Sequence, residues 1–127
     1  MKEPYLNSKE RSALIDRYLG RVVHIEIDRP IGYIHHKENY DLVYPINYGY
    51  IPGVLGGDAE ELDVYLLGVS HPVQEYDVRI IGAVLRSDDV EDKLVGAPVG
   101  MTFSKEEIAE AVRFQEQYHV STVETIE

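Results

Sequence analysis

Two short acidic segments carry the side chains that are best suited to chemistry in this sequence. The first covers residues 58–63 (DAEELD) and follows two glycines, and the second covers residues 88–92 (DDVED). Two unit charges 4 Å apart repel by about 4 kcal/mol at an effective dielectric constant of 20, so converging carboxylates need a cation. Hard divalent cations, Mg²⁺ above all, prefer such oxygen ligands. The segments therefore fit a divalent-metal site, although spacing alone favours the alternative of solvated acidic loops.

Tyrosine and lysine side chains near these segments are suited to binding an anion. The chain has ten Tyr, two Phe and no Trp, and three of the tyrosines fall within residues 44–52 (YPINYGYIP). Their rings could pack against one another, or a phenol could donate a hydrogen bond to an anion. Lys93 directly follows the second acidic segment. Its ammonium is either an ion-pair partner or a phosphate ligand, and its position alone favours the ion pair.

Composition narrows the classes of protein and partner. The 127 residues include 12 Lys and Arg against 23 Asp and Glu, a net charge of −11, and fit a single domain spanning residues 1–127. An acidic surface repels phosphate backbones, so we expect no nucleic-acid partner. We also expect no membrane partner and a cytoplasmic location, because no apolar run approaches the ~20 residues that span a bilayer. The absence of cysteine excludes disulfides, thiol nucleophiles and thiolate metal sites.

Local patterns predict a helix, a series of strands and a second helix. Asn7 with Glu10, and Ser104 with Glu107, are capping pairs that predict helices over residues 8–19 and 104–118. Between them, alternating or β-branched stretches predict strands over residues 22–28, 41–44, 62–69, 76–86 and 93–97, with short strands and turns throughout the Pro- and Gly-rich residues 29–57. Consecutive short strands without intervening helices favour a small closed antiparallel barrel with flanking helices.

Four segments, in matching order and spacing, resemble the family I soluble inorganic pyrophosphatases. They are residues 44–52, similar to the family's YPxNYGYIP; residues 58–64, similar to DGDPxDV; residues 88–95, similar to an acidic segment ending in DxK; and residues 114–119, similar to a helix end bearing Tyr-Lys. The resemblance covers residues 22–119. It implies a mainly β (α+β) fold, an OB-like closed five-stranded β-barrel with N- and C-terminal helices. It also implies a homo-oligomer that hydrolyses pyrophosphate to two phosphates, and the second helix is a candidate interface.

The same resemblance implies a role for each matching side chain. The metal ligands would be Asp58, Asp63, Asp88 and Glu91, with Glu26 as an outer acidic ligand. The catalytic residues would be Glu60, which orients and deprotonates the attacking water, with Tyr48 and Lys93. The residues facing phosphoryl oxygens would be Tyr48, Lys93, Tyr118, His119 and, nearest to the family's arginine, His36. The cofactor would be Mg²⁺, with Mn²⁺ or another divalent ion as alternatives. This set suits a reaction that depends on charge neutralisation and a metal-activated water.

The sequence departs from the family pattern at several of these positions. Glu60 and Glu91 stand where the family has Asp, and a 1 Å misplacement can cost ~10²-fold in rate. Ala59 and Glu61 replace the signature glycine and proline, and residues 29–37 (RPIGYIHHK) replace a longer hairpin with a Lys and an Arg. His119 stands in place of a lysine. We therefore expect the site to work best where one or more of His35, His36 and His119 is protonated, unless the His35–His36 pair belongs to a solvated turn.

Three functions are open on this basis. The first is Mg²⁺-dependent pyrophosphate hydrolysis. The second is hydrolysis of another phosphoanhydride, such as a nucleotide, which fewer fixed cations and a shorter hairpin would favour. The third is a metal-dependent binding or assembly module that has kept the barrel and lost turnover. Phosphate-release assays with and without Mg²⁺ distinguish them.

Overall fold

The computed structural model describes residues 5–126. Its elements in chain order are α1 (Ser8–Tyr18), β1 (Val22–Arg29), β2 (Ile34–His36), β3 (Asp41–Val43), β4 (Asn47–Leu55), β5 (Glu61–Leu66), β6 (Glu75–Arg86), β7 (Lys93–Ala97), α2 (Lys105–Glu116) and β8 (Ser121–Thr125). No helix in this part of the chain is long and apolar enough to cross a membrane.

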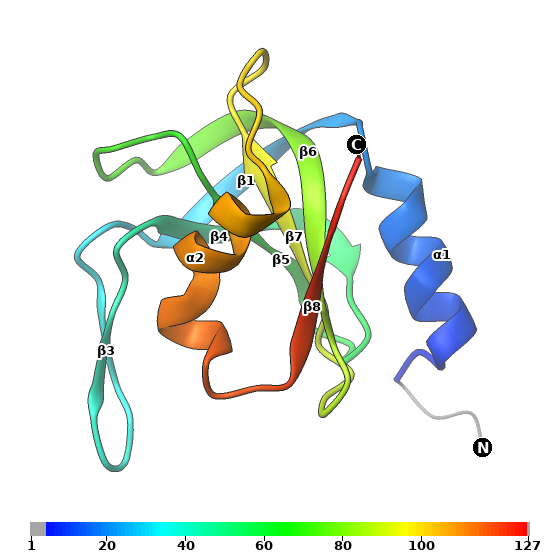
Figure 1. Ribbon diagram of the computed structural model, residues 1–127, viewed down its shortest axis with the longest axis horizontal. Coiled ribbons are helices and arrows are strands. Elements are labelled where there is room, and N and C mark those ends of the chain that lie inside the picture. Colours follow the sequence, from blue (N-terminus) through cyan, green and yellow to red (C-terminus); the bar gives the residue numbers. More distant parts are fainter. Residues whose placement is uncertain (1–4, 127) are drawn as a thin grey trace.

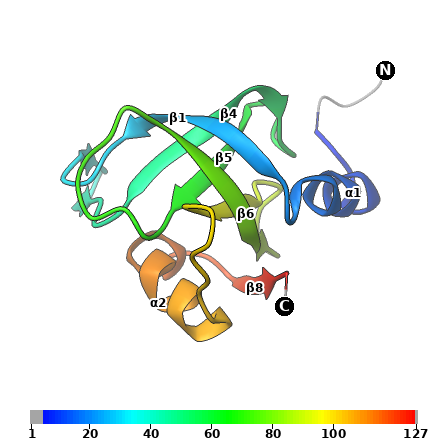
Figure 2. The ribbon, with the colours of Figure 1, turned by 90° about the horizontal axis from the view of Figure 1, so that it is seen from above.

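Five of the strands close into a barrel, which confirms the predicted fold class. They pair in the order β1-β4-β5-β7-β6, and β6 returns to pair with β1. β8 extends the sheet from β6, and β2 with β3 forms a separate hairpin that projects beside α2 (Figure 1). Viewed from above, α1 and α2 lie on different sides of the barrel (Figure 2).

Both helices begin where the capping pairs predict. Asn7 caps α1 with Glu10, and Ser104 caps α2 with Glu107, each pair forming a reciprocal capping box. The helices end slightly earlier than expected, and the chain continues after α2 into β8, a strand that was not predicted. β8 is short and buries only Val123 fully, so its pattern is too weak to identify from sequence.

The core contains two buried clusters. One fills the barrel around Ile25, Leu66 and Leu94 and receives Ile15 from α1. The other lies under α2 and includes Tyr44, Tyr48 and Tyr65. The ring centroids are 5.5 Å apart for Tyr44–Tyr48 and 5.0 Å apart for Tyr48–Tyr65. Tyr44 and Tyr48 therefore pack as rings, one of the two alternatives that the sequence left open.

A parallel strand pair brings the two acidic segments together. β5 and β7 run parallel, with Val64 opposite Leu94, so Asp63 near the start of β5 and Lys93 at the start of β7 lie at the same end of the barrel. The preceding loops also touch, because a Cβ on Gly57 would lie 2.1 Å from the carbonyl oxygen of Val90. Only glycine permits this approach, which places segments 30 residues apart side by side.

Candidate active site

A polar cavity of about 320 Å³ opens at this end of the barrel. Its lining is drawn from β1, the β2–β3 hairpin, β4, β5, the 86–93 segment and the end of α2. The lining residues are Asp28, Arg29, His35, Lys37, Tyr48, Asp63, Arg86, Asp89, Glu91, Lys93, Gln115 and His119. Four carboxylates thus face four permanent cations. A chain of net charge −11 has placed four of its 12 Lys and Arg residues around one hollow, which suits a site for an anion.

Lys93 is at the centre of this charge arrangement. Its ammonium lies 2.7 Å from Asp63 Oδ2 and 2.7 Å from Glu91 Oε1, and its side chain is 2% exposed. It also lies 5.3 Å from the centroid of the Tyr48 ring. Burial favours a higher pKa for Glu91, but Lys93 and Arg86 outweigh it and lower that pKa below its usual range. Lys93 is therefore an ion-pair partner of both carboxylates, and it favours the charged form of Glu91.

Two further carboxyl groups lie in an environment that opposes their charge. Burial raises the pKa of Asp58, and the negative charge of Glu91 adds to the rise. Burial also raises the pKa of Asp28, with a further contribution from Asp63. A cation bound near these groups would remove both penalties.

The donor chemistry of this cluster fits a hard divalent cation. Asp58, Asp63 and Glu91 supply carboxylate oxygens, and burial, with a smaller contribution from Glu91, raises the pKa of Asp58. Within residues 5–126, however, no three carboxylate or imidazole groups surround a common point at ligand distance. Asp63 and Glu91 instead converge on the ammonium of Lys93.

Two of the predicted metal ligands lie away from this cluster. Asp88 is exposed outside the cavity, with Oδ2 3.2 Å from Nδ1 of His119, which does line the cavity. Glu26 is on the outer face of β1, where it accepts a hydrogen bond of 2.9 Å from the Tyr50 hydroxyl. The structure therefore brings together only part of the ligand set that the resemblance implies.

The remaining predicted residues lie at or beyond the rim. Glu60 is exposed on the turn that carries Asp58, and its amide donates to Asp58 Oδ1 at 3.1 Å. Tyr118 is 51% exposed and stacks on Tyr40, with ring centroids 4.8 Å apart. His36 points to solvent, with Nδ1 2.8 Å from Asp41 Oδ1.

The β2–β3 hairpin places His35, and not the predicted His36, in the cavity. Side chains alternate between the two faces of a strand, so His35 and Lys37 face the cavity while His36 faces away. Burial lowers the pKa of His35, and the positive charges of Arg29 and Lys37 lower it further. His35 is therefore neutral in the free protein near pH 7.

Several cavity residues were missed as site residues, notably Arg86. Arg86 is 5% exposed, and its guanidinium contacts Glu116 at 2.7 Å and Glu91 at 3.2 Å. Burial opposes its charge, yet the ion pair with Glu116 raises the pKa of Arg86 above its ordinary value. The sequence did contain an indication of this role, because Arg86 ends an apolar strand and is followed by an acidic segment. An arginine in such a position is buried only when carboxylates pair with it.

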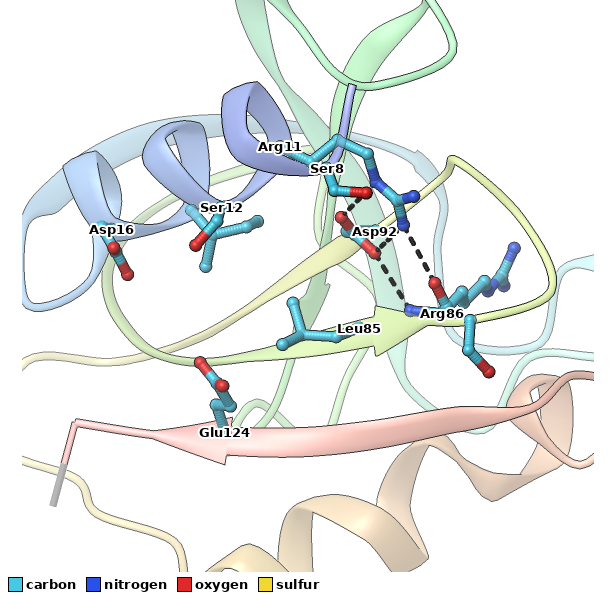
Figure 3. A pocket seen from close by; sticks show the side chains of 10 residues that line it. Ser8, Arg11, Ser12, Asp16, Leu85, Arg86, Asp92 and Glu124 are labelled. Carbon is cyan, nitrogen blue, oxygen red and sulfur yellow. Dashed lines mark hydrogen bonds and ion pairs between the residues drawn. The ribbon is translucent and has the colours of Figure 1, made fainter. Parts of the chain in front are cut away.

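A second cavity, of about 410 Å³, lies between α1, the end of β6 and β8 (Figure 3). It is next to the loop of residues 87–92, which joins β6 to β7. There Arg11 of α1 donates from Nε and Nη2 to the two carboxylate oxygens of Asp92, at 2.9 and 2.7 Å. Arg11 also donates to the carbonyl oxygen of Arg86 at 2.9 Å, and Asp92 accepts from the amide of Arg86 at 3.0 Å. α1 thus holds both ends of the loop that carries Glu91.

Comparisons with known proteins agree with this architecture. The sequence model described as "Inorganic pyrophosphatase" matches residues 15–124. The inorganic pyrophosphatase of Campylobacter jejuni is 30% identical over 94 residues, which are 68% of this chain and 54% of that protein. The chain thus spans about half the length of this curated relative.

Solved structures share the fold at low sequence identity. An inorganic pyrophosphatase from Ehrlichia chaffeensis superposes with a TM-score of 0.63 at 17% identity, covering 85% of this chain and 88% of that chain. One from Coxiella burnetii gives 0.60 at 19% identity, covering 84% and 86%.

Proposed function

This chain belongs to the inorganic pyrophosphatase family, and from that premise we propose that it hydrolyses inorganic pyrophosphate to two phosphates in the polar cavity. The observation that carries the proposal is the buried Lys93 ammonium, held by Asp63 and Glu91 in a hollow with three further permanent cations. Pyrophosphate is a small, highly charged anion. Catalysis of its hydrolysis depends mainly on positioning and charge stabilisation.

The cations of the cavity would bind the phosphoryl oxygens. Arg29 and Lys37 supply permanent charge from the β1 end and the hairpin, and His119 lines the hollow near the end of α2. His35 would gain a proton when an anion binds beside it, because that anion offsets the cations that lower its pKa. Tyr48 keeps its phenolic proton, since burial raises its pKa well above the ordinary value.

Asp58, Asp63 and Glu91 are the residues that would hold Mg²⁺, with Mn²⁺ or another divalent ion as an alternative. A bound divalent ion in such a site neutralises phosphoryl charge and makes a water molecule nucleophilic at neutral pH. Lys93 would hold Asp63 and Glu91 in place through its two ion pairs, and it favours the charged form of Glu91. Glu60, next to Asp58 on the exposed turn, stays our candidate for the base that orients the water.

The cavity favours pyrophosphate over a nucleotide as substrate. Charged and polar side chains make up nearly all of its lining, and its volume of about 320 Å³ is at the small end for ligand pockets. A nucleotide would also need a surface on which its base could pack. The resemblance also predicts a homo-oligomer, which sedimentation of the purified chain would test.

Phosphate release tests the proposal directly. We expect Mg²⁺-dependent release from pyrophosphate, little from ATP, and none when a chelator replaces Mg²⁺. Glu91→Gln should lose activity by at least 100-fold, while the matched variant Glu110→Gln, changed on the exposed face of α2, should keep it. Release from ATP alone would support the nucleotide alternative. Mg²⁺ binding without release from either substrate would support a non-catalytic module.

A further inference from the structure

The β2–β3 hairpin carries two of the side chains that line the polar cavity, His35 and Lys37. It forms a two-stranded sheet of its own, separate from the barrel, and projects beside α2 (Figure 1). A two-stranded hairpin is only marginally stable in water unless another element packs against it. The positions of His35 and Lys37 therefore depend on what holds the hairpin to the rest of the protein.

The side chains that hold the hairpin lie on the same face as these two residues. Residues directly opposite each other in an antiparallel pair project to the same face. Leu42 lies opposite His35 and is buried in the cluster under α2. Tyr40 lies opposite Lys37 at the next position of this register, and the Lys37 amide donates to the Tyr40 carbonyl oxygen at 2.8 Å. Leu42 thus anchors the base of the hairpin, and Tyr40 is the corresponding side chain at its tip.

Tyr40 stacks on Tyr118, which follows α2. The ring centroids are 4.8 Å apart and the ring planes differ by 22°. Both side chains are exposed, and both lie outside the lining of the cavity. Tyr118 directly precedes His119, which does line the cavity and whose amide donates to the carbonyl oxygen of Glu116 at 2.9 Å. The stack therefore connects two parts of the cavity wall, the hairpin with Lys37 and the end of α2 with His119.

We propose that Tyr40 and Tyr118 are positioning residues, whose stacked rings hold the hairpin tip against the end of α2 and so keep Lys37 in the cavity that His119 also lines. Without the stack, the tip would leave α2 in part of the molecules and take Lys37 with it. The fraction of molecules competent to bind the anion would fall, and the apparent affinity would fall by the same factor.

This role for Tyr118 differs from the one that the resemblance implies, in which its phenol faces a phosphoryl oxygen. Tyr40 and Tyr118 act here through the position of a cation, so the rings are needed and the hydroxyl groups are not. The inference rests on the proposed function and adds to it the residues that hold the hairpin in place.

Kinetics of tyrosine variants separate stacking from a hydroxyl contact. Tyr40→Leu and Tyr118→Leu remove the stack, whereas Tyr40→Phe and Tyr118→Phe keep a ring at each position. Each leucine variant should raise KM for pyrophosphate about 5-fold and change kcat less than about 2-fold, because a stacked aromatic pair is a modest interaction. Both phenylalanine variants should keep the wild-type KM. The double leucine variant should resemble either single variant, because both substitutions remove the same contact.

Tyr5→Leu is the matched control for the chemical change. Tyr5 is exposed and lies just before α1, which is on a different side of the barrel from α2 (Figure 2). This variant should leave KM and kcat unchanged. Hydrogen exchange adds a readout that needs no substrate: the Lys37 amide should exchange faster in Tyr40→Leu and Tyr118→Leu than in the wild type, because a hairpin tip that has left α2 opens more readily.

Three kinetic results would overturn the inference. In the first, Tyr118→Phe raises KM as much as Tyr118→Leu, which would mean that the phenol contacts the substrate. In the second, the effects of the two leucine substitutions on KM add. In the third, the leucine variants have a lower melting temperature but an unchanged KM, which would mean that the stack is only structural.

Failure of the proposed function can be distinguished from failure of this inference. If the wild-type chain released no phosphate, the proposed function would fail, and calorimetric binding of pyrophosphate would still test the stack. Affinity should then fall about 5-fold in the leucine variants and stay unchanged in the phenylalanine variants. Equal affinity in all variants would overturn the inference, and a wild type that binds no pyrophosphate would overturn both.

Discussion

Replacing Lys93 with methionine should destabilise the protein in a way that depends on pH. The carboxylate oxygens of Asp63 and Glu91 each lie 2.7 Å from Nζ, so they are at most twice that distance apart. Two unit charges about 5.4 Å apart repel by about 3 kcal/mol at an effective dielectric constant of 20. Methionine fills a similar volume but removes the charge, so Lys93→Met should lose about 3 kcal/mol at pH 7.5. For a chain of this length that is a fall in melting temperature of roughly 10–15 °C.

The loss should shrink as the pH falls. In the wild type, Lys93 and Arg86 lower the pKa of Glu91, so the stability from this charged form is present above its ordinary pKa and is lost below it. In the variant, repulsion and burial should raise the pKa of one of the two carboxyl groups. That group then takes up a proton on acidification, and the repulsion disappears.

Thermal unfolding followed by circular dichroism at pH 7.5 and pH 5.0 measures both effects. The gap between wild type and Lys93→Met should be clearly smaller at pH 5.0. Lys105→Met, at an exposed position that starts α2, controls for the loss of one lysine from an acidic chain and should change the melting temperature little. An equal gap at both pH values would mean that lost packing, rather than carboxylate repulsion, causes the destabilisation, and our electrostatic account of the site would be wrong.

Three further predictions address the turn, the barrel and the hairpin. Ala59 has a φ of 66°, a conformation that is strained for alanine by about 1–2 kcal/mol. Ala59→Gly should remove this strain at an entropy cost of about 0.5–1 kcal/mol, and so raise the melting temperature by a few degrees. A lower melting temperature would show that the turn is not strained. Gly49→Ala should prevent folding or lower the free energy of unfolding by more than about 3 kcal/mol, because its Cβ would lie 1.8 Å from the carbonyl oxygen of Glu26. Gly56→Ala is the control: its Cβ would have its nearest contact at 3.4 Å, so denaturation should show little change in stability. Pyrophosphate affinity, measured by calorimetry, should weaken from pH 6 to 8 as His35 loses its proton, and His35→Asn should flatten this profile; an unchanged slope would exclude His35 as its source.

The sequence allowed the helices and the barrel class to be predicted, because both follow from local chemistry. Capping boxes at Asn7 and Ser104 determine where the helices begin, and consecutive short strands exclude a parallel α/β sheet. The parallel pairing of β5 with β7 could not be derived in this way. It joins segments 30 residues apart, and only the family resemblance indicated that Asp63 and Lys93 would meet.

The sequence predicted which acidic segments would contribute to the candidate site, but not how their side chains would be arranged. Whether His35 or His36 faces the cavity depends on the phase of a three-residue strand, and a shift of one residue reverses it. Arg86 and Glu116 were missed because burial of a charged pair is a tertiary event that leaves no periodic signal. The ammonium of Lys93 between two carboxylates likewise depends on distances that spacing along the chain does not give.

The bidentate hydrogen bonds from Arg11 to Asp92 attach α1 to the loop of residues 87–92. The opposite side of this loop faces the polar cavity. Helix ends fray more readily than barrel strands melt. Warming, or a protease cut within the first turn of α1, should therefore release residues 87–92 while the five-stranded barrel is still intact. Heat inactivation would then precede global unfolding, and the temperature interval between the two would measure how strongly α1 stabilises the loop.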